Sequence, residues 1–230
     1  MTAAEMVTAF KFGLDKFDSL NYPNFLPAEI DLLLNQAQDA FIKQRYGVTN
    51  IKKQSFEETQ KRTEDIKNVV VRATISPAAN ASDNINSYSR FVTLPSDHWI
   101  IIQELTGLTC PNCHDVNVTD RVYTEAIQHN DYSKLISNPF GKPNHEKVLR
   151  LMENGRVELI PPSDCTITNY YLTYIKKPVR INSVSNPNVN CELSEHTHQE
   201  IVNNAISIAL EGIEARRTQT FNPITKNTEE

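Results

Sequence analysis

Apolar residues recur with a helical period near the start of the chain. Between Thr2 and Leu20 they form one stripe along a predicted helix, which Asn21-Tyr22-Pro23 ends. Between Pro27 and Tyr46 a proline in the first turn and Gly47 after the last turn indicate both ends of a second helix. Its apolar positions are Ile30, Leu33, Leu34, Ala37, Phe41 and Ile42.

A third, polar helix is predicted from Ser55 to Val69. It opens with Ser55-Phe56-Glu57-Glu58, a capping box in which the serine and glutamate side chains bond to each other's exposed backbone donors. Another helix is predicted from Glu195 to Gln219, with Ser194 as its cap, and a polar end follows.

From Val69 onward, β-branched and aromatic residues alternate with polar ones in short runs, which predicts strands. Asn154-Gly155 lies between two of these runs and supplies the positive φ angles of a tight hairpin turn. Pro77 to Ser87 has little to bury and predicts a surface loop. The predicted strands are Val69 to Ile75, Arg90 to Leu94, Trp99 to Thr109, Val116 to Val122, Lys147 to Met152, Arg156 to Ile160 and Thr166 to Lys176.

This order of elements predicts an α+β fold with N-terminal helices, a central and mostly antiparallel β-rich region, and a long C-terminal helix. We expect a single domain over residues 1–230. Within it, residues 1–69 are helical, 70–193 are β-rich, 194–217 form the C-terminal helix and 218–230 form a C-terminal arm.

Composition narrows the class of protein. A formal net charge of -5 gives no overall attraction to a nucleic-acid backbone. No stretch approaches the roughly 20 apolar residues of a transmembrane helix, and the N-terminus lacks the features of a signal peptide. We therefore expect the protein to remain in the compartment where it is made. The four cysteines, Cys110, Cys113, Cys165 and Cys191, are then expected to be reduced thiols.

Cys110-Pro111-Asn112-Cys113-His114 matches the spacing of c-type haem attachment and of half a zinc site. Haem attachment requires export, and a dithiol redox site would open a helix where this sequence predicts a strand. Zinc needs two more ligands, from Cys165, Cys191 or the pair His196 and His198, and none repeats the Cys-x-x-Cys spacing. The favoured interpretation is a tight turn beside small apolar cysteines, with no metal and no cofactor.

Catalytic motifs are also missing from the sequence. Six glycines give little material for a phosphate-binding loop, and no nucleophile elbow or His-Glu-x-x-His pattern occurs. His196 and His198 are expected to be solvated near a helix start. Short basic clusters are expected on solvated faces, and contact with an acidic partner or passing DNA is the alternative. These clusters are Arg45, Lys52 and Lys53; Lys176, Lys177 and Arg180; and Arg216 and Arg217.

Three blocks of the sequence, in order along the chain, carry a resemblance to a known family of proteins. The first is Pro23 to Tyr46, which includes Asn35-Gln36-Ala37-Gln38 and Phe41-Ile42-Lys43-Gln44-Arg45-Tyr46. The second is His129-Asn130-Asp131-Tyr132 followed by Asn138-Pro139-Phe140-Gly141-Lys142-Pro143. The third is Tyr174-Ile175-Lys176-Lys177-Pro178, with Cys191-Glu192-Leu193 and His198-Gln199-Glu200-Ile201.

These three blocks resemble virion structural proteins of crAss-like phages of gut Bacteroidetes. The resemblance implies a head-to-tail connector or ring protein, similar to the adaptor and tail-tubular proteins of short-tailed phages. Such a subunit is non-enzymatic and forms a homo-oligomeric ring of about twelve copies by a heterologous contact that closes. Its expected partners are the portal, other tail and ring proteins, and transiently the passing double-stranded DNA, within a virion assembled from protein made in the host cytoplasm. Expected interface residues are Phe25, Phe41, Tyr46, Asn138, Pro139, Phe140, Phe221, Pro223 and Ile224.

A rival hypothesis is a small metal- or nucleic-acid-binding regulatory module. Nucleic-acid binding would favour a basic face that the composition does not offer. An enzyme would have to assemble its chemistry from residues that show no motif spacing.

Overall fold

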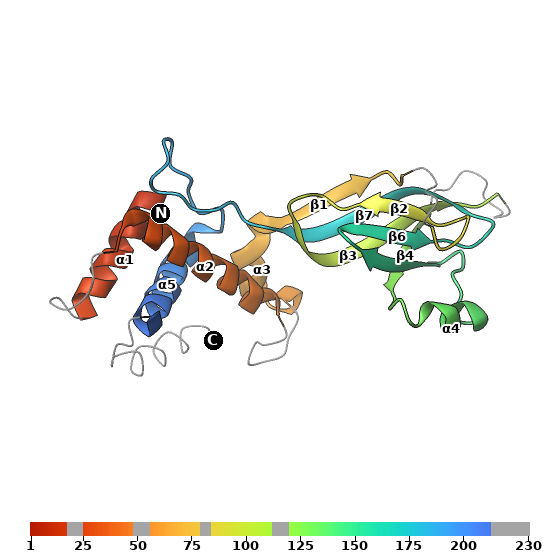
Figure 1. Ribbon diagram of the computed structural model, residues 1–230, viewed down its shortest axis with the longest axis horizontal. Helices are drawn as coiled ribbons and strands as arrows, with labels where there is room; N and C mark the ends of the chain where they lie inside the picture. The colour runs from red at the N-terminus through yellow and green to blue at the C-terminus, as the bar shows by residue number, and fades with distance from the viewer. Residues whose placement is uncertain (18–24, 48–55, 79–83, 112–119, 213–230) are drawn as a thin grey trace. The chain divides into compact units, whose positions relative to one another are not determined.

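A computed structural model of the chain describes residues 1–17, 25–47, 56–78, 84–111 and 120–212. The chain divides into two compact units, one formed by Met1–Val69 with Pro178–Glu230 and the other by Val70–Lys177. The first unit is helical and the second contains the sheet, so the predicted α+β fold is confirmed (Figure 1). Residues 178–193, which we expected in the β-rich region, belong to the helical unit.

The helical unit is built on α1 (Ala3–Phe17), α2 (Pro27–Tyr46) and α5 (His198–Gly212). Helix α5 packs against both α1 and α2 (Figure 1). Shorter elements are η1 (Phe56–Glu58), α3 (Gln60–Ile66), η2 (Lys67–Val69) and η3 (Glu195–Thr197). The core they enclose contains Met6, Phe10, Ile30, Leu34, Phe41, Ile42, Ile66, Ile201, Val202, Ile206 and Leu210.

The observed helix boundaries follow the local sequence signals. Helix α2 has the predicted bounds, and at its start the Leu26 N–H donates to Glu29 Oε2 at 2.8 Å. The predicted third helix is instead a seven-residue α3 between two 3-10 turns, and Ser55 of the capping box lies outside the described residues. Residues 213–219 of the predicted C-terminal helix also lie outside them.

An extended segment that follows the sheet is held on α2 by polar side chains. Asn35 Nδ2 donates to Ile181 O at 2.9 Å and Asn35 Oδ1 accepts from Ile181 N at 2.8 Å, as a neighbouring strand would. One turn earlier, Asp31 Oδ2 accepts from the backbone N–H and the hydroxyl of Ser183 at 2.8 and 3.0 Å. Asn182 pairs with Val189, and the loop between them extends away from the helices (Figure 1).

The β unit contains a seven-stranded sheet in the order β1-β7-β3-β4-β5-β6-β2. Neighbouring strands are antiparallel except β4 and β5, which run parallel because the long connection between them includes α4 (Tyr132–Ser137). The tight turn predicted at Asn154-Gly155 is present, with φ angles of 38° and 74°. The strands are β1 (Val70–Ile75), β2 (Arg90–Thr93), β3 (His98–Thr109), β4 (Asp120–Ala126), β5 (Lys147–Glu153), β6 (Arg156–Ile160) and β7 (Thr166–Lys176).

The sheet is curled, so strands from both ends of the order line one core. Val71 and Ala73 of β1 and Val92 of β2 pack in the same apolar cluster, and after β1 the Ala78 N–H donates to Phe91 O at 2.7 Å. Successive side chains along β5 point to opposite faces of the sheet, so the neighbours of Val148, which lies in this cluster, face the other side. There Leu149 and Leu151 form a second cluster with Ile160, covered by Ile127 and Tyr132.

Candidate assembly surfaces

A surface turn after α4 brings together three of the predicted interface residues, Asn138, Pro139 and Phe140. All three are exposed, and Phe140 most of all, at 92%. The turn is held by Asn138, whose Oδ1 accepts from Phe140 N at 3.1 Å and whose carbonyl accepts from Gly141 N at 3.0 Å. The turn therefore presents an aromatic ring to solvent.

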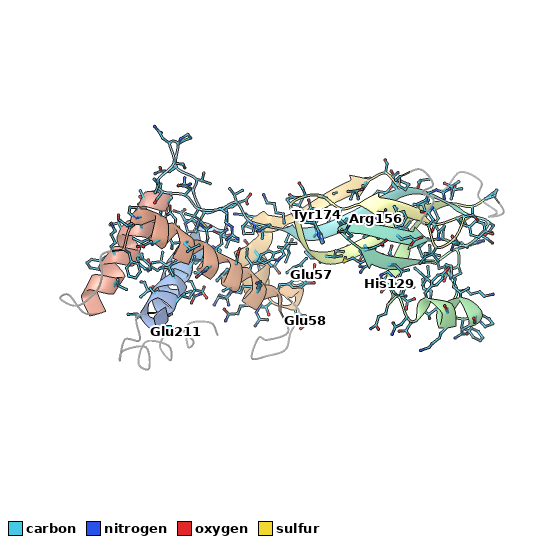
Figure 2. All side chains as sticks on the ribbon, in the orientation of Figure 1. Glu57, Glu58, His129, Arg156, Tyr174 and Glu211 are labelled. Carbon is cyan, nitrogen blue, oxygen red and sulfur yellow. A yellow bond between two sulfur atoms is a disulfide. The ribbon has the colours of Figure 1, made fainter. Side chains whose placement is uncertain are left out.

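The base of this turn is tightly packed. Gly141 is buried, and a Cβ there would lie 3.0 Å from both the carbonyl oxygen and the Cδ2 of Leu135. At the start of α4, Tyr132 packs against the cluster under β5. His129, which Figure 2 labels, has its Nε2 3.0 Å from Met152 O. Phe140 thus stands on a connection that is anchored to the sheet at both of its ends.

The predicted interface residues of α2 and its approach are less exposed. Phe25 is half-buried, with its ring edge-on to Phe10 at a centroid distance of 6.0 Å. Phe41 is only 1% exposed, which favours a packing role within the helical unit. Tyr46 is half-buried, and burial, with a smaller effect of the Glu57 charge, raises its pKa. The remaining predicted residues, Phe221, Pro223 and Ile224, lie outside the described residues.

A polar hollow on the outer face of the sheet was missed by the sequence analysis. It has a volume of about 260 Å³, and the Arg121 guanidinium carbon lies 4.1 Å from the centre of the Tyr171 ring. Two guanidinium groups can bind a carboxylate or phosphate through paired hydrogen bonds. The sequence pattern that could have indicated this hollow is the alternation of polar residues along β1, β3 and β7. The lining residues are Arg72, Ala73, Thr74, Gln103, Leu105, Arg121, Tyr171, Leu172 and Thr173.

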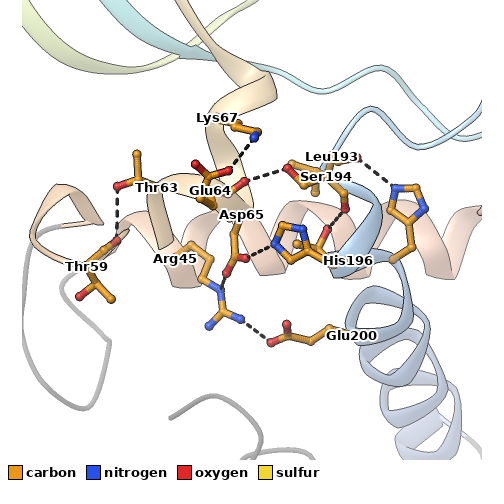
Figure 3. A network of polar contacts seen from close by, with 12 residues as sticks. Arg45, Thr59, Thr63, Glu64, Asp65, Lys67, Leu193, Ser194, His196 and Glu200 are labelled. Carbon is orange, nitrogen blue, oxygen red and sulfur yellow. Dashed lines mark hydrogen bonds and ion pairs between the residues drawn. The ribbon is translucent and has the colours of Figure 1, made fainter. Parts of the chain in front are cut away.

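The expectation of solvated basic clusters and histidines is wrong for two residues. Arg45 is 4% exposed and joins Asp65 and Glu200 in an ion-pair network that links α2, α3 and α5 (Figure 3). His198 is also 4% exposed, because its Nε2 faces Leu193 O and its Nδ1 faces the N-terminal amine, each at 3.0 Å. His196 is exposed and contacts Asp65. Lys52, Lys53, Arg216 and Arg217 lie outside the described residues.

Two cysteines meet where β3 ends and β7 begins. Thr109 pairs with Thr166 in the sheet, which places the next pair, Cys110 and Cys165, opposite each other. Their Cα atoms are 4.3 Å apart and a disulfide joins them. The prediction that both are reduced is wrong, because it considered the compartment and not the strand register. Cys191 is a free thiol, and burial raises its pKa.

His145 lies beside this disulfide. One nitrogen of its ring and the two sulfur atoms all lie within 4.8 Å of one another. The imidazole reaches this place from the connection before β5, where Asn144 and Lys147 form an isolated bridge. Cys113 and His114, the other members of the Cys-x-x-Cys-His motif, lie outside the described residues. The structure thus gathers two sulfurs and one imidazole that are far apart in the sequence.

Comparison with known proteins agrees with an assembly role. No helix in the described ranges is long and apolar enough to cross a membrane. Ring protein 3 of Bacteroides phage crAss001 is 26% identical over 228 residues, covering 91% of this chain and 95% of that protein. Ring protein 4/5 of the same phage is 26% identical over 207 residues, covering 81% and 83%. The model of the phage tail ring protein 3/4 family matches residues 1–221, so the chain belongs to this family of ring proteins of crAss-like phages and is a structural subunit of the virion.

Proposed function

We propose that this ring subunit is part of the head-to-tail connector, where about twelve copies join the portal to the tail around the passage for DNA. It acts through surfaces and not through catalysis. Membership of the ring protein family supports assembly with copies of itself and with other tail and ring proteins.

Phe140 is the observation that carries the proposal for a specific surface. A phenylalanine that is 92% exposed leaves most of its apolar area in water. Burying such a side chain against a partner contributes about 1.5–3 kcal/mol. Because the turn is held by Asn138 and Gly141, little conformational entropy is lost when the ring docks. A closed ring repeats the contact in every copy, so a modest gain per subunit becomes large for the assembly.

The negative net charge of the chain is compatible with a brief contact with DNA. A net charge of -5 gives no overall attraction to phosphate, so DNA would not be held as it passes. The two arginines of the hollow on the sheet are candidates for a carboxylate of a neighbouring subunit, because their guanidinium groups suit that shape.

The test is electron microscopy of particles that carry Phe140→Ala, with Lys134→Ala as the matched control. Lys134 lies on α4, the short helix just before the turn, is 80% exposed and is paired with Asp131, so its replacement changes α4 and keeps the aromatic ring. We expect the Phe140 variant to reduce incorporation into the connector several-fold and the Lys134 variant to incorporate as wild type.

Two results would contradict the proposal. If a map of the wild-type particle placed this chain away from the portal-proximal rings, the connector position would be wrong. If the Phe140 variant incorporated at the wild-type level, or the ring faced solvent in the map, the turn would not be an assembly surface.

A further inference from the structure

We propose that Cys110, Cys165 and His145 form a zinc site when the disulfide is reduced. The three side chains already gather one nitrogen and two sulfurs within 4.8 Å, although they come from positions up to 55 residues apart. Zinc binding by this cluster would not depend on where the ring sits in the tail.

The donor set suits zinc. Zinc in proteins is bound by thiolate sulfur and imidazole nitrogen, almost always with tetrahedral geometry in structural sites. Two sulfurs bound at about 2.3 Å on a tetrahedral ion lie ~3.8 Å apart. Once reduction removes the sulfur–sulfur bond, the thiolates of Cys110 and Cys165 need only separate to that distance. A fourth ligand, from solvent or protein, completes the tetrahedron.

Asp164 is placed to orient the histidine. Its Oδ2 lies 3.0 Å from His145 Nε2, and its Oδ1 lies 3.6 Å from Cys165 Sγ. A histidine that binds zinc through one ring nitrogen commonly donates the other to a carboxylate, which fixes the tautomer and the ring orientation. With Nε2 held by Asp164, the ring of His145 would bind zinc through Nδ1.

The backbone holds the ligands in place on neighbouring connections. Cys110 and Cys165 follow the Thr109–Thr166 pair of the sheet, and the Cys165 N–H donates to Pro162 O at 3.2 Å. His145 lies in a turn that Asn144 and Lys147 close with two backbone hydrogen bonds of 3.0 and 3.1 Å. The His145 side chain is 47% exposed, so an ion can arrive from solvent.

The disulfide and the metal exclude each other. A thiol reductant supplies two electrons and two protons, so that the disulfide becomes two thiols and the reductant becomes its own disulfide. Zinc then replaces the two thiol protons, which are released to solvent. Oxidation of the thiolates by a two-electron oxidant such as a small-molecule disulfide returns the bond and releases the ion.

The experiment measures zinc in the full-length chain by mass spectrometry after reduction, loading with zinc and gel filtration. We expect about one zinc per chain for the reduced wild type and a large loss of zinc after oxidation. Cys110→Ser, Cys165→Ser and His145→Ala should each weaken zinc binding at least tenfold. Asp164→Asn should weaken it by about 10–100-fold through the orientation of His145.

Matched controls are Cys191→Ser, which removes a cysteine outside the cluster, and His129→Ala, which removes another exposed histidine of the β unit. Both should bind zinc as wild type. A reduced wild type without zinc would overturn the proposal, and so would full zinc binding by both the Cys110 and His145 variants.

A second measurement avoids variants that fail to fold. The reduced wild type is alkylated with and without zinc, and each cysteine is followed by peptide mass spectrometry. We expect zinc to slow the alkylation of Cys110 and Cys165 at least tenfold and to leave the rate at Cys191 unchanged. Equal rates at Cys110 and Cys165 with and without zinc would overturn the site.

Discussion

Arg45 and Asp65 form an ion pair in which both side chains are almost completely buried. The distance from Nε to Oδ2 is 2.9 Å, and the side chains are 5% and 1% exposed. The same arginine contacts Glu200 Oε1 through Nη2 at 2.5 Å, and His196 Nε2 lies 2.8 Å from Asp65 Oδ1 (Figure 3). One guanidinium group therefore joins α2 and α3 to α5, which is far from both in the sequence.

Arg45→Met should destabilise the helical unit by about 3–5 kcal/mol, because it leaves the Asp65 carboxylate buried without its cation. The measurement is denaturant unfolding followed by the helical signal in circular dichroism. The control is Lys67→Ala, which breaks a solvent-screened pair with Glu64 in which the two side chains are 55% and 49% exposed, and should have a much smaller effect. Equal losses for the two variants would show that burial does not govern the Arg45 contribution.

Asn35→Ala should release the segment that follows the sheet. Ile181 is 2% exposed, and this substitution removes the side-chain partners of its N–H and carbonyl groups. Each buried group left without a partner costs about 1–3 kcal/mol. Hydrogen exchange at the Ile181 amide should become at least tenfold faster, while Gln36→Ala, at the exposed neighbouring position, should leave it unchanged. Unchanged exchange in the Asn35 variant would mean that other contacts hold the segment.

Local sequence patterns were sufficient to predict most of the helices and strands. Helix α2 and strands β6 and β7 have the predicted bounds, because the periods of their apolar residues and the residues at their ends agree. Helix α4 was missed, since Tyr132–Ser137 is too short for a period and covers its cluster mainly through Tyr132. The segment around Ile181 was assigned to the β-rich region because its partners are side chains of α2, which no local pattern reveals.

Tertiary relationships limited the prediction of sites. The turn at Asn138, Pro139 and Phe140 could be selected from the sequence, but only the structure shows that Phe140 is 92% exposed and that Gly141 packs closely against Leu135. His145 was not considered as a partner for Cys110, because the parallel pairing of β4 and β5 sets its position. The expectation that no metal binds was drawn without this histidine.

The carboxyl of Glu104 is buried among the strands of the β unit, and burial raises its pKa. Hydrogen bonds from the Tyr170 hydroxyl and a contact with Arg150, each at 2.8 Å, act against that rise. In the unfolded chain a glutamate carboxyl has a pKa of about 4.3. Because the folded pKa is higher, the contribution of Glu104 to stability is greatest below the unfolded value and is lost as pH rises through the folded value.

Glu104→Gln should remove this pH dependence. The unfolding free energy of wild type minus that of the variant should fall as pH increases from about 4 through the raised pKa of Glu104. Unfolding is followed by the fluorescence of Trp99, the only tryptophan of the chain. Trp99 lies on β3, so its signal reports on the β unit. Tyr170→Phe removes a hydrogen bond that lowers the pKa of Glu104. In the Tyr170 variant, the Glu104 contribution to the unfolding free energy should therefore continue to fall up to a higher pH. A wild-type-minus-variant difference that rises with pH would contradict the sign of the shift.

Gly13 allows the close approach of α1 and α5. A Cβ at this position would lie 2.5 Å from the Cδ1 atom of Ile206, whose side chain is buried. Such a distance is far below van der Waals contact, so either the two helices separate or the isoleucine leaves its rotamer. At Gly212, in contrast, a Cβ would meet nothing within 4 Å in the part of the chain that the structure describes.

Gly13→Ala should therefore destabilise the helical unit by about 1–3 kcal/mol through overpacking, although alanine is the better helix former by up to about 1 kcal/mol. Ile206→Val removes the clashing Cδ1 and alone costs about 0.5–1.5 kcal/mol. In the double variant the remaining Cγ1 position lies 3.7 Å from the new Cβ, an ordinary contact. The double variant should then be more stable than the sum of the two single losses implies, with a coupling of about 1 kcal/mol or more in denaturant unfolding. Gly212→Ala should be neutral or stabilising by up to about 1 kcal/mol, which separates helix propensity from packing. Additive losses at positions 13 and 206 would show that the two helices do not meet at this pair.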